Sequence, residues 1–535
     1  MLTRIGILPA GLAFALAISA SAQDPAAFPL GVAAGDVTDS SAVVWTRSAG
    51  GADVRLELSS TADFSRPLAF VAEAAANTAH DATIKIDVTG LAAATTYFYR
   101  FVSLTDGSTS RVGRFNTLAA SNDAAPHSFV FSGDTNYSFA PFTVVEDMAA
   151  ENADLFIWFG DTIYGDVPSG GLGVAETLDD YWAKYRQIRS EIGIRDALAN
   201  MALLTGGDDH EVRNDYAGTD PRLDPLQRTA GLQAFFDYMP IRENAAEPYR
   251  IYRRFRAGAN VEFFVLDGRQ YRDPSVKAEC NSNPDPYGFL LGPLSRRDDC
   301  VDLLTDPART MLGAEQYEWL TAGLLESTAA VKFVVNNVPL SYVGPYPYDR
   351  WDGYDGERRQ LLEVIDQGAI DGVIFLTTDI HANAYNPDVL AYFRARRSDY
   401  ALPGNVAVPE IIVGPLGNAT FHQSVTGAGD VLGRFGVALA GTAERVLTSK
   451  VRRVNGLEML DTNQVSYVRV DISSDGLVDI SYRGLRPGSQ TDSAAFFDGD
   501  VSTAPSDSGP AFLTPCALPL LGLAGVGALL TRRRA

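Results

Sequence analysis

Two apolar segments that each end in Gly-Asp constrain the fold of this chain more than any other feature. Residues 156–159 lead into a glycine and Asp161, and residues 127–131 lead through a serine and a glycine into Asp134. An apolar run that stops at Gly-Asp is typical of a buried strand whose carboxyl end reaches a cleft. Because the helix-like segment 141–150 lies between them, the pattern predicts a strand-helix-strand unit with both carboxylates at one sheet edge. That arrangement is suited to hold a metal pair.

The length and charge of the chain narrow its class. At 535 residues, two or more domains are expected, because a single hydrophobic core stops growing at about 250–300 residues. The net charge of -22 argues against a broad basic surface for nucleic acid or anionic membranes. A small phosphorylated substrate remains compatible with this charge, since bound cations reverse the local field.

The first 22 residues are predicted to be an export signal peptide. Arg4 supplies the positive charge, residues 7–18 the apolar stretch, and residues 20–22 a small-residue cleavage site. The mature chain would begin near Gln23 and be periplasmic, secreted or held at the cell surface. A single arginine precedes the apolar run, so a twin-arginine route is not indicated.

Export brings the three cysteines into an oxidising compartment. Cys280 and Cys300 flank a loop rich in proline, glycine and asparagine, and we expect a disulfide between them. Cys516 has no obvious partner in the sequence.

Residues 28–118 are predicted to form an all-β domain. Short apolar runs such as 41–46 and 83–88 recur at the spacing of a β-sandwich. Leu91 and the alternation over 97–101 resemble the late strands of a fibronectin type III domain. We interpret this domain as a structural or positioning module.

The body of the chain, residues 125–486, alternates helical and apolar segments, which indicates a sheet covered by helices. Its later part contains two runs, 465–472 and 477–482, that read as a closing hairpin. The helical segments are 178–197 and 314–327, and the apolar runs are 263–267, 332–335 and 373–376.

Two segments are expected to follow the body. Residues 487–512 are rich in Ser, Thr, Asp, Gly and Pro and are predicted to be a flexible linker. Residues 513–535 form an apolar tail with three arginines at 532–534, and it resembles a bacterial C-terminal sorting or anchor signal. Such a tail would contact a membrane or a sorting protease. The sequence carries no signal for the oligomeric state.

In three more segments of the body, an apolar run is followed by polar side chains that can bind metals. Residues 203–211 end in Asp-Asp-His-Glu, 333–339 contain Asn-Asn-x-Pro, and 373–381 end in Asp-Ile-His. Two of the five histidines fall in these segments, which concentrates a scarce residue where ligands are expected. The other three, His80, His127 and His422, stand outside every motif and are interpreted as surface or core residues.

Taken in order, these motifs resemble a known superfamily. The succession Gly-Asp, Gly-Asp-x-x-Tyr, Asp-His-Glu, Asn-x-Pro and Asp-x-His is similar to the binuclear metallophosphoesterases. Within them, residues 208–211, 266–272 and 379–381 resemble the PhoD-like alkaline phosphatase and phosphodiesterase family. The resemblance spans about residues 34–417 and implies an α/β metallophosphoesterase body with layered αββα-type sheets, preceded by the fibronectin type III-like β-sandwich.

The resemblance also implies a ligand set. One metal would be held by Asp134, Asp161, Tyr164 and His381, and the other by Asp161, Asp209, Asn337 and Asp379, with Asp161 as the bridge.

The chemistry of these ligands suggests which metals they hold. Two carboxylates, a phenolate and an imidazole are a hard set that suits Fe(III), and the all-oxygen second set suits Ca(II) or Mg(II). Many PhoD-like enzymes carry a cysteine where Asp134 stands, so Mn also fits the first site.

The implied mechanism is in-line attack on phosphorus by a hydroxide that two metals activate. His210 would protonate the leaving oxygen, and Glu211 would orient its imidazole. Arg269 would contact a phosphate oxygen, or else pair with Asp267 or Asp273 at the surface. Asn214 would contact the substrate or a metal, or else cap its loop. Asp166 and Asp208 are interpreted as acids that lie outside the ligand set.

The resulting hypothesis is an exported metal-dependent hydrolase of small phosphate esters. One alternative is a purple-acid-type phosphomonoesterase, which would use histidines where this chain has Asn337 and Asp379. The other is a non-catalytic surface binding protein on a phosphatase scaffold. Retention of the whole ligand set favours the enzyme.

Overall fold

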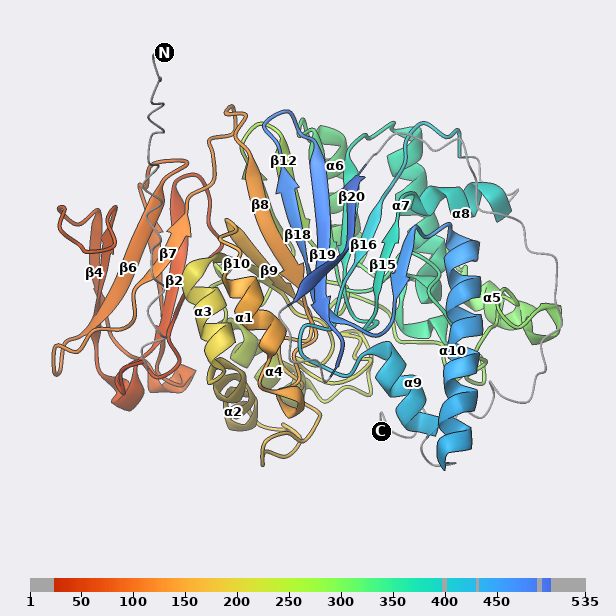
Figure 1. Ribbon diagram of the computed structural model, residues 1–535, viewed down its shortest axis with the longest axis horizontal. Helices are drawn as coiled ribbons and strands as arrows, with labels where there is room; N and C mark the ends of the chain where they lie inside the picture. The colour runs from red at the N-terminus through yellow and green to blue at the C-terminus, as the bar shows by residue number, and fades with distance from the viewer. Residues whose placement is uncertain (1–23, 397–401, 430–432, 488–492, 502–535) are drawn as a thin grey trace, which may run out of the picture.

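The computed structural model describes residues 24–396, 402–429, 433–487 and 493–501 (Figure 1). The predicted signal peptide at 1–22, the apolar tail at 513–535 and Cys516 lie outside these residues. Within the described ranges, no helix is long and apolar enough to cross a membrane.

The N-terminal domain is a β-sandwich, as the spacing of its apolar runs predicts. One face is a four-stranded sheet in the order β4-β3-β6-β7, and the other is formed by β1, β2 and β5. Alternate residues of β6, including Tyr97, Tyr99 and Phe101, are buried between the faces. The seven strands are β1 (Val32–Gly35), β2 (Ser41–Arg47), β3 (Val54–Ser59), β4 (Phe70–Ala74), β5 (Thr83–Thr89), β6 (Thr96–Ser103) and β7 (Gly113–Asn116).

The sandwich is continuous with the body through its first strand. Gly35 of β1 pairs in parallel with Leu203, so β1, β2 and β5 extend a nine-stranded sheet in the order β20-β19-β18-β8-β9-β10-β1-β2-β5. A Cβ at Gly35 would lie 2.6 Å from the Pro240 carbonyl oxygen, so only glycine fits this junction. The body strands of this sheet are β8 (His127–Ser132), β9 (Leu155–Phe159), β10 (Ala202–Gly206), β18 (Val465–Ile472), β19 (Val478–Leu485) and β20 (Ala494–Val501).

A second, seven-stranded sheet has the order β11-β12-β13-β14-β16-β15-β17. Its central strands run parallel, as do β8, β9 and β10 of the first sheet. All are buried except for the first two residues of β8, which explains their largely apolar sequences. The strands are β11 (Arg253–Ala257), β12 (Val261–Val265), β13 (Val331–Asn336), β14 (Val373–Thr377), β15 (Asn383–Asn386), β16 (Glu410–Ile412) and β17 (Met459–Asp461).

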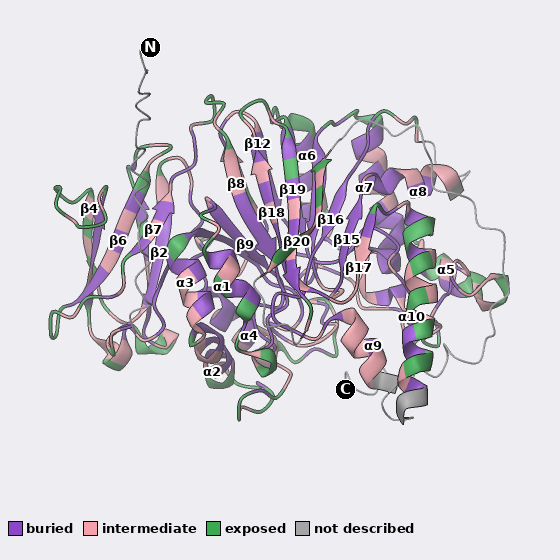
Figure 2. Cartoon of the chain, in the orientation of Figure 1, coloured by how far each residue is buried: buried purple, intermediate pink, exposed green. Residues whose placement is uncertain are grey.

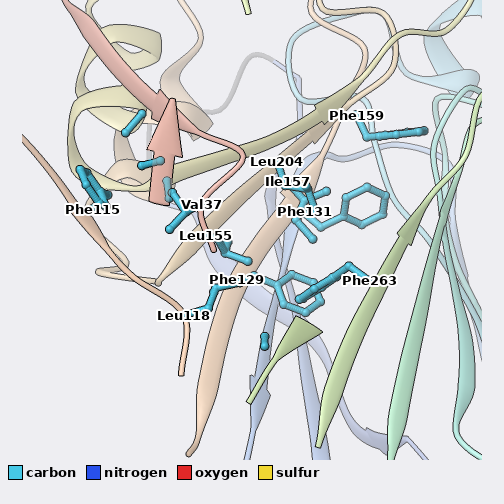
Figure 3. Packing of buried hydrophobic residues seen from close by; sticks show 14 of the residues in the cluster. Val37, Phe115, Leu118, Phe129, Phe131, Leu155, Ile157, Phe159, Leu204 and Phe263 are labelled. Carbon is cyan, nitrogen blue, oxygen red and sulfur yellow. The ribbon is translucent and has the colours of Figure 1, made fainter. Parts of the chain in front are cut away.

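The two sheets pack face to face, and helices cover their outer faces. Phe129 of the first sheet meets Phe263 and Phe333 of the second edge-on, with ring centroids 5.6 and 5.0 Å apart (Figure 3). Figure 2 shows buried residues along nearly the whole length of the central strands. Separate apolar clusters join each sheet to its helices, which gives the layered αββα arrangement. The helices are α1 (Thr143–Ala149), α2 (Leu178–Arg189), α3 (Ile192–Asn200), α4 (Pro225–Tyr238), α5 (Asp298–Leu304), α6 (Ala314–Glu326), α7 (Asp355–Gln367), α8 (Val389–Arg396), α9 (Phe421–Gly429) and α10 (Gly433–Asn455).

Two element predictions need correction. The predicted helix 178–197 is broken into α2 and α3, because Glu191 is extended and begins a new helix. The predicted linker 487–512 contains a strand, β20, which pairs with β19. Phe497 of β20 packs against Tyr385 and Tyr482, and this apolar contact orders a segment that composition alone assigned to a linker.

Two other predictions are confirmed. Cys280 and Cys300 form a disulfide with an S–S distance of 1.96 Å. The closing hairpin is present as β18 and β19, which pair antiparallel along their whole lengths.

Candidate functional site

Polar residues follow the carboxyl ends of strands in both sheets and meet between them. Asp134 follows β8, Asp161 follows β9, and Asp209 follows β10. From the second sheet, Asp379 and His381 follow β14. Since parallel strands end at one edge of a sheet, their loops converge at a single place.

The backbone at these strand ends is tightly constrained. Gly133 lies against β9, where a Cβ would come within 2.2 Å of the Phe159 carbonyl oxygen, so glycine is required. Four residues of the site adopt left-handed backbone conformations, which are strained for side chains with a Cβ. They are Asp134 (φ 62°), Asp161 (φ 48°), Asp379 (φ 76°) and His381 (φ 53°).

The first group of potential ligands contains Asp134, Asp161 and His381, each offering an atom within 4.8 Å of the others. His381 Nε2 lies 3.6 Å from Asp134 Oδ1 and 3.0 Å from the Tyr164 hydroxyl. His381 Nδ1 lies 2.7 Å from the Ala419 carbonyl, which accepts its proton and leaves Nε2 facing the group. The sequence therefore predicted four residues that the fold does bring together.

Asp134 provides the test of whether a cation fits here. Its side chain is 1% exposed, and neither carboxylate oxygen has a hydrogen-bond partner among the described residues. Burial, together with the charges of Asp379 and Asp208, raises the pKa of Asp134 well above its usual value. A buried carboxylate without donors is stabilised by a positive ion, so the residues present fit a metal.

Asp161 belongs to a second group as well, with Asp209 and His210. Burial and the charge of Asp209 raise the pKa of Asp161 well above its usual value. A third group of acids, Asp209, Asp215 and Asp349, lies next to it. Asp161 is thus the residue that the first two groups share, and its role as a bridging ligand stays a prediction.

The two remaining predicted ligands have other contacts. Asn337 is buried, and its amide accepts a hydrogen bond from Gly268 N at 2.7 Å and donates one to the Gly207 carbonyl. Asp379 belongs to none of the three groups of described residues, and its Oδ1 lies 3.7 Å from Arg269 Nη2. Their role as ligands stays a prediction.

Arg269 is a buried counter-ion and lies at the centre of the acids. The predicted surface pairing with Asp267 or Asp273 is wrong, because Arg269 is 1% exposed and its Nε binds Asp208. Its Nη1 donates to both oxygens of Asp349 at 3.0 and 2.8 Å. Its Nη2 has no hydrogen-bond partner among the described residues.

The pKa values of two neighbouring acids beside Arg269, Asp208 and Asp209, shift in opposite directions. Burial raises the pKa of Asp208 to about 7 although Arg269 opposes the shift. Burial acts on Asp209 in the same direction, but the charges of Arg269 and His210 outweigh it and hold the pKa of Asp209 below its usual range. Asp209 is therefore the acid of this pair that is ionised throughout the neutral range.

His210 points its Nε2 towards Asp161, which the first two groups share, and towards Asp209. This atom lies 3.9 Å from Asp161 Oδ2 and 3.9 Å from Asp209 Oδ1, and the ring lies 4.2 Å from that of Tyr164, centroid to centroid. On its other side, Nδ1 lies 2.5 Å from Asp166 Oδ1. Asp166 thus holds the imidazole.

Glu211, which was predicted to orient His210, binds other groups. Its Oε1 accepts hydrogen bonds from the Thr162 amide and hydroxyl, both at 2.6 Å, and its Oε2 accepts one from Asp208 N at 2.7 Å. These contacts tie the loop after β10 to the loop after β9. The sequence could not distinguish Asp166 from Glu211, because adjacency to His210 favoured Glu211 while the side chains point to different partners.

Residues outside the motifs complete the surroundings. Asn214 and Asp349 line a cavity of about 420 Å³ that opens beside Asp379 and His381. The backbone N–H of Asn214 donates to Asp166 Oδ2 at 2.8 Å. Two histidines assigned to no motif have acid partners elsewhere, with His80 on Asp237 and His422 on Glu444.

Comparison with known proteins agrees with this geometry. The family model of the PhoD-like phosphatase matches residues 128–478, and that of the PhoD-like phosphatase N-terminal domain matches residues 13–119. Alkaline phosphatase D of Bacillus subtilis (strain 168) is 31% identical over 396 residues, which cover 66% of this chain and 64% of that protein. The matched region is thus shorter than two thirds of this relative.

Solved structures share the fold. A structure of PhoD aligns with a TM-score of 0.72 and 23% identity over 95% of this chain and 98% of that one. A purple acid phosphatase from yellow lupin (Lupinus luteus) seeds aligns with a TM-score of 0.52 and 13% identity, over 87% of this chain and 73% of that one. With its family model covering most of the body and its metal-ligand groups at the expected strand ends, the chain belongs to the PhoD-like phosphatase family.

Proposed function

We propose that this chain is an exported, metal-dependent phosphoric ester hydrolase that acts as an alkaline phosphatase or phosphodiesterase. The observation that carries the proposal is the pair of acid and histidine groups that share Asp161, the first of which contains the unpartnered carboxylate of Asp134. Buried acids at this density are stabilised by cations, and such pairs of cations hydrolyse phosphate esters.

The donor chemistry suggests which ions are held. Asp134, Asp161, Tyr164 and His381 form a hard set suited to Fe(III) or Mn, and the acids around Asp209 suit Ca(II) or Mg(II). When bound, such ions would neutralise phosphoryl oxygens and lower the pKa of a coordinated water.

The protein's own groups carry the remaining steps. His210, held by Asp166, donates the proton that the leaving oxygen takes as its bond to phosphorus breaks. Water supplies the oxygen that replaces it, so a diester and water yield a monoester and an alcohol. Arg269 keeps an unpartnered Nη2 donor for a phosphoryl oxygen.

The remaining parts of the proposal concern the ends of the chain. The signal peptide at 1–22 would export the protein, and the apolar tail at 513–535 would be retained or removed at the cell surface. The N-terminal sandwich, which we propose is of fibronectin type III type, would position the body without contributing chemistry.

The test is a metal analysis of the mature chain from residue 23 onward, with an assay on 4-nitrophenyl phosphate and bis(4-nitrophenyl) phosphate. We expect bound metal, hydrolysis and its loss on chelation. Asp161→Asn should lower both metal content and hydrolysis, whereas Asp302→Asn, which changes an exposed acid on α5, should lower neither. A wild-type chain that stays metal-free and inactive after incubation with Fe, Mn and Ca would contradict the proposal.

A further inference from the structure

The cavity beside the metal-ligand groups extends well beyond the acids. One end is bounded by Asp349, Asp379 and His381, and the rest runs between α9, α10 and the loops that follow Pro284 and Tyr342. Its volume of about 420 Å³ lies within the range of about 300–1,000 Å³ typical of small-ligand sites. Figure 2 shows α9 and α10 side by side, with α10 next to β17 at the edge of the second sheet.

The walls away from the acids are mostly apolar, with a few polar side chains such as Ser424, Thr448 and Thr462 among them. Side chains from four segments contribute to them, so the surface is built by the tertiary fold and not by one exposed helix. They include Leu291, Val343, Phe421, Val425, Leu447 and Val451. An apolar wall of this kind stabilises a ligand through the hydrocarbon surface it removes from water.

The acids in this part of the wall are already satisfied by the protein. Glu444 accepts a hydrogen bond from the Thr462 hydroxyl at 2.6 Å and lies 2.7 Å from His422 Nδ1. Asp285 accepts hydrogen bonds from the amides of residues 289–291, the Ser295 hydroxyl and the Tyr342 hydroxyl. These carboxylates therefore do not require donors from a ligand.

Cationic side chains line the same cavity. Arg350 uses its Nη2 to bind the carbonyls of residues 344–346, which fixes the loop that carries Val343. Lys277 Nζ lies 3.8 Å from Asp215, a member of the third acid group. The cavity thus combines charged groups suited to an anionic phosphate with a long apolar wall.

We propose that the substrate is an amphiphilic phosphate ester, in which one substituent on phosphorus is a long apolar chain lying along α9 and α10. This inference rests on the proposed function and names its substrate class. The hydroxyls of Thr448 and Thr462 in this wall already donate to Glu444. A sugar or nucleoside in that position would therefore bury most of its hydroxyl groups against apolar side chains, which is unfavourable. A glycerophospholipid and a single-chain alkyl or isoprenyl phosphate share the required chemistry.

The first test uses 4-nitrophenyl alkyl phosphate diesters, with alkyl chains from methyl to octyl, on the metal-loaded protein. Each methylene that enters the cavity should raise kcat/KM about threefold to fourfold. Equal kcat/KM for the methyl and octyl diesters would overturn the inference but leave the hydrolase intact. Failure to hydrolyse any of the diesters or 4-nitrophenyl phosphate would contradict the proposed function itself.

A matched pair of variants on α10 tests where the alkyl chain of the substrate binds. Leu447→Trp fills the cavity and should bring the octyl-to-methyl ratio of kcat/KM towards one. Leu439→Trp places the same side chain on the same helix at a residue that is 40% exposed and outside the cavity lining, and should leave the ratio unchanged. An unchanged ratio in a folded Leu447→Trp protein would contradict the location, and Val343→Trp serves on the opposite wall if Leu447→Trp does not fold.

Binding supplies a readout that does not depend on turnover. Decylphosphonate should bind at least tenfold more tightly than methylphosphonate by calorimetry, and Leu447→Trp should remove that difference while Leu439→Trp keeps it. Dioctanoyl phosphatidylcholine and decyl phosphate then distinguish the two sources, because the faster substrate identifies the natural class. If neither is turned over faster than its short-chain counterpart, glycerophosphocholine or methyl phosphate, the inference is overturned.

Discussion

His210 is held by one acid and directed at two others. Its Nδ1 contacts Asp166, while its Nε2 faces Asp161 and Asp209 at equal distances. A residue placed in this way can transfer a proton at a single point in space, because the ring cannot rotate away without losing its contact with Asp166.

Replacing His210 by alanine should lower kcat about 10²- to 10⁴-fold, the usual contribution of a general acid. The thermal unfolding temperature should change little, because the imidazole is not part of an apolar cluster. Steady-state kinetics and thermal unfolding measure the two effects. His80→Ala is the matched control, since His80 pairs with Asp237 through the same ring nitrogen at 2.6 Å, away from the site. Wild-type kcat in His210→Ala would contradict the role.

The positioning role of Asp166 can be separated from that of Glu211 with double variants. If Asp166 acts through His210, then Asp166→Asn should lower kcat about 10- to 100-fold in the wild type and hardly at all in the His210→Ala background. Glu211→Gln loses an acceptor for the Thr162 and Asp208 amides, so it should lower the free energy of unfolding in either background. Asp166→Asn and His210→Ala effects that multiply would show that Asp166 acts independently.

The limits of sequence reading are clearest at this scale. Asp134, Asp161, Asp209 and His381 could be predicted because each follows an apolar strand directly. Arg269 could be identified as a candidate, but its partners could not, since Asp208 and Asp349 lie 61 and 80 residues away in the chain. The local pattern of apolar residues reveals where a strand ends. A long-range ion pair depends instead on how the two sheets pack against each other.

At the scale of elements, the loop between Cys280 and Cys300 forms one wall of the cavity. The disulfide closes it over a separation of 20 residues, and both sulfurs are buried in the apolar cluster of the second sheet. Asp285 binds three amides within the loop. Residues 281–297, which precede α5 and contain one 3-10 turn but no α-helix or strand, are ordered by the covalent link and this carboxylate.

The double variant Cys280→Ser and Cys300→Ser should lower the free energy of unfolding by about 3 kcal/mol, because the unfolded chain gains the freedom of an open loop. Urea denaturation of the oxidised and mutant proteins measures the difference. A double variant as stable as the wild type would show that Asp285 and the apolar cluster hold the loop without the disulfide.

Element prediction succeeded where apolar runs were long and failed where they were short or interrupted. β12, β13 and β14 are continuous apolar strands, and their positions agree with the predicted runs. No pattern predicted α9 or α10, because glycines recur through residues 427–441 and lower the helical signal. β20 was assigned to a linker because its order depends on contact with distant aromatic rings.

At the scale of the whole molecule, the two sheets bring many acidic side chains together at their common edge. Arg269 and Arg272 are the buried cations that pair with this group through Asp349, and they do not reach Asp134 by any hydrogen bond within the described residues. The stability of the folded chain should therefore depend on bound metal ions.

Removing metals with a chelator should lower the unfolding temperature, and more so at pH 8 than at pH 5. In the metal-free protein, burial raises the pKa of Asp379 to about 6 and that of Asp208 to about 7, from a usual value near 4. A raised folded pKa adds stability that is complete below about pH 4 and is lost as the pH rises through 6 to 7. Calorimetry at both pH values, with and without added metal, checks this. Equal unfolding temperatures for the chelated and loaded proteins would contradict it.

The junction at Gly35 should be sensitive to a single methyl group. Gly35→Ala would bring a Cβ within 2.6 Å of the Pro240 oxygen and 2.9 Å of the Leu203 oxygen, so the free energy of unfolding should fall by about 1–3 kcal/mol. Denaturant unfolding, followed by fluorescence and by circular dichroism, should show one transition in both proteins. Gly173→Ala, where a Cβ meets no atom within 4 Å, is the control.

The shared sheet determines how such a chain can be engineered or can evolve. Because β1 of the sandwich is the neighbour of β10 of the body, and Trp45 of the sandwich donates to the Asp237 carbonyl, removing residues 24–118 would leave an open strand edge and a cavity. The N-terminal domain therefore cannot be exchanged as an independent module. A replacement would have to bring its own strand to β10, so recombination at this boundary should yield soluble proteins only between chains that already share the junction.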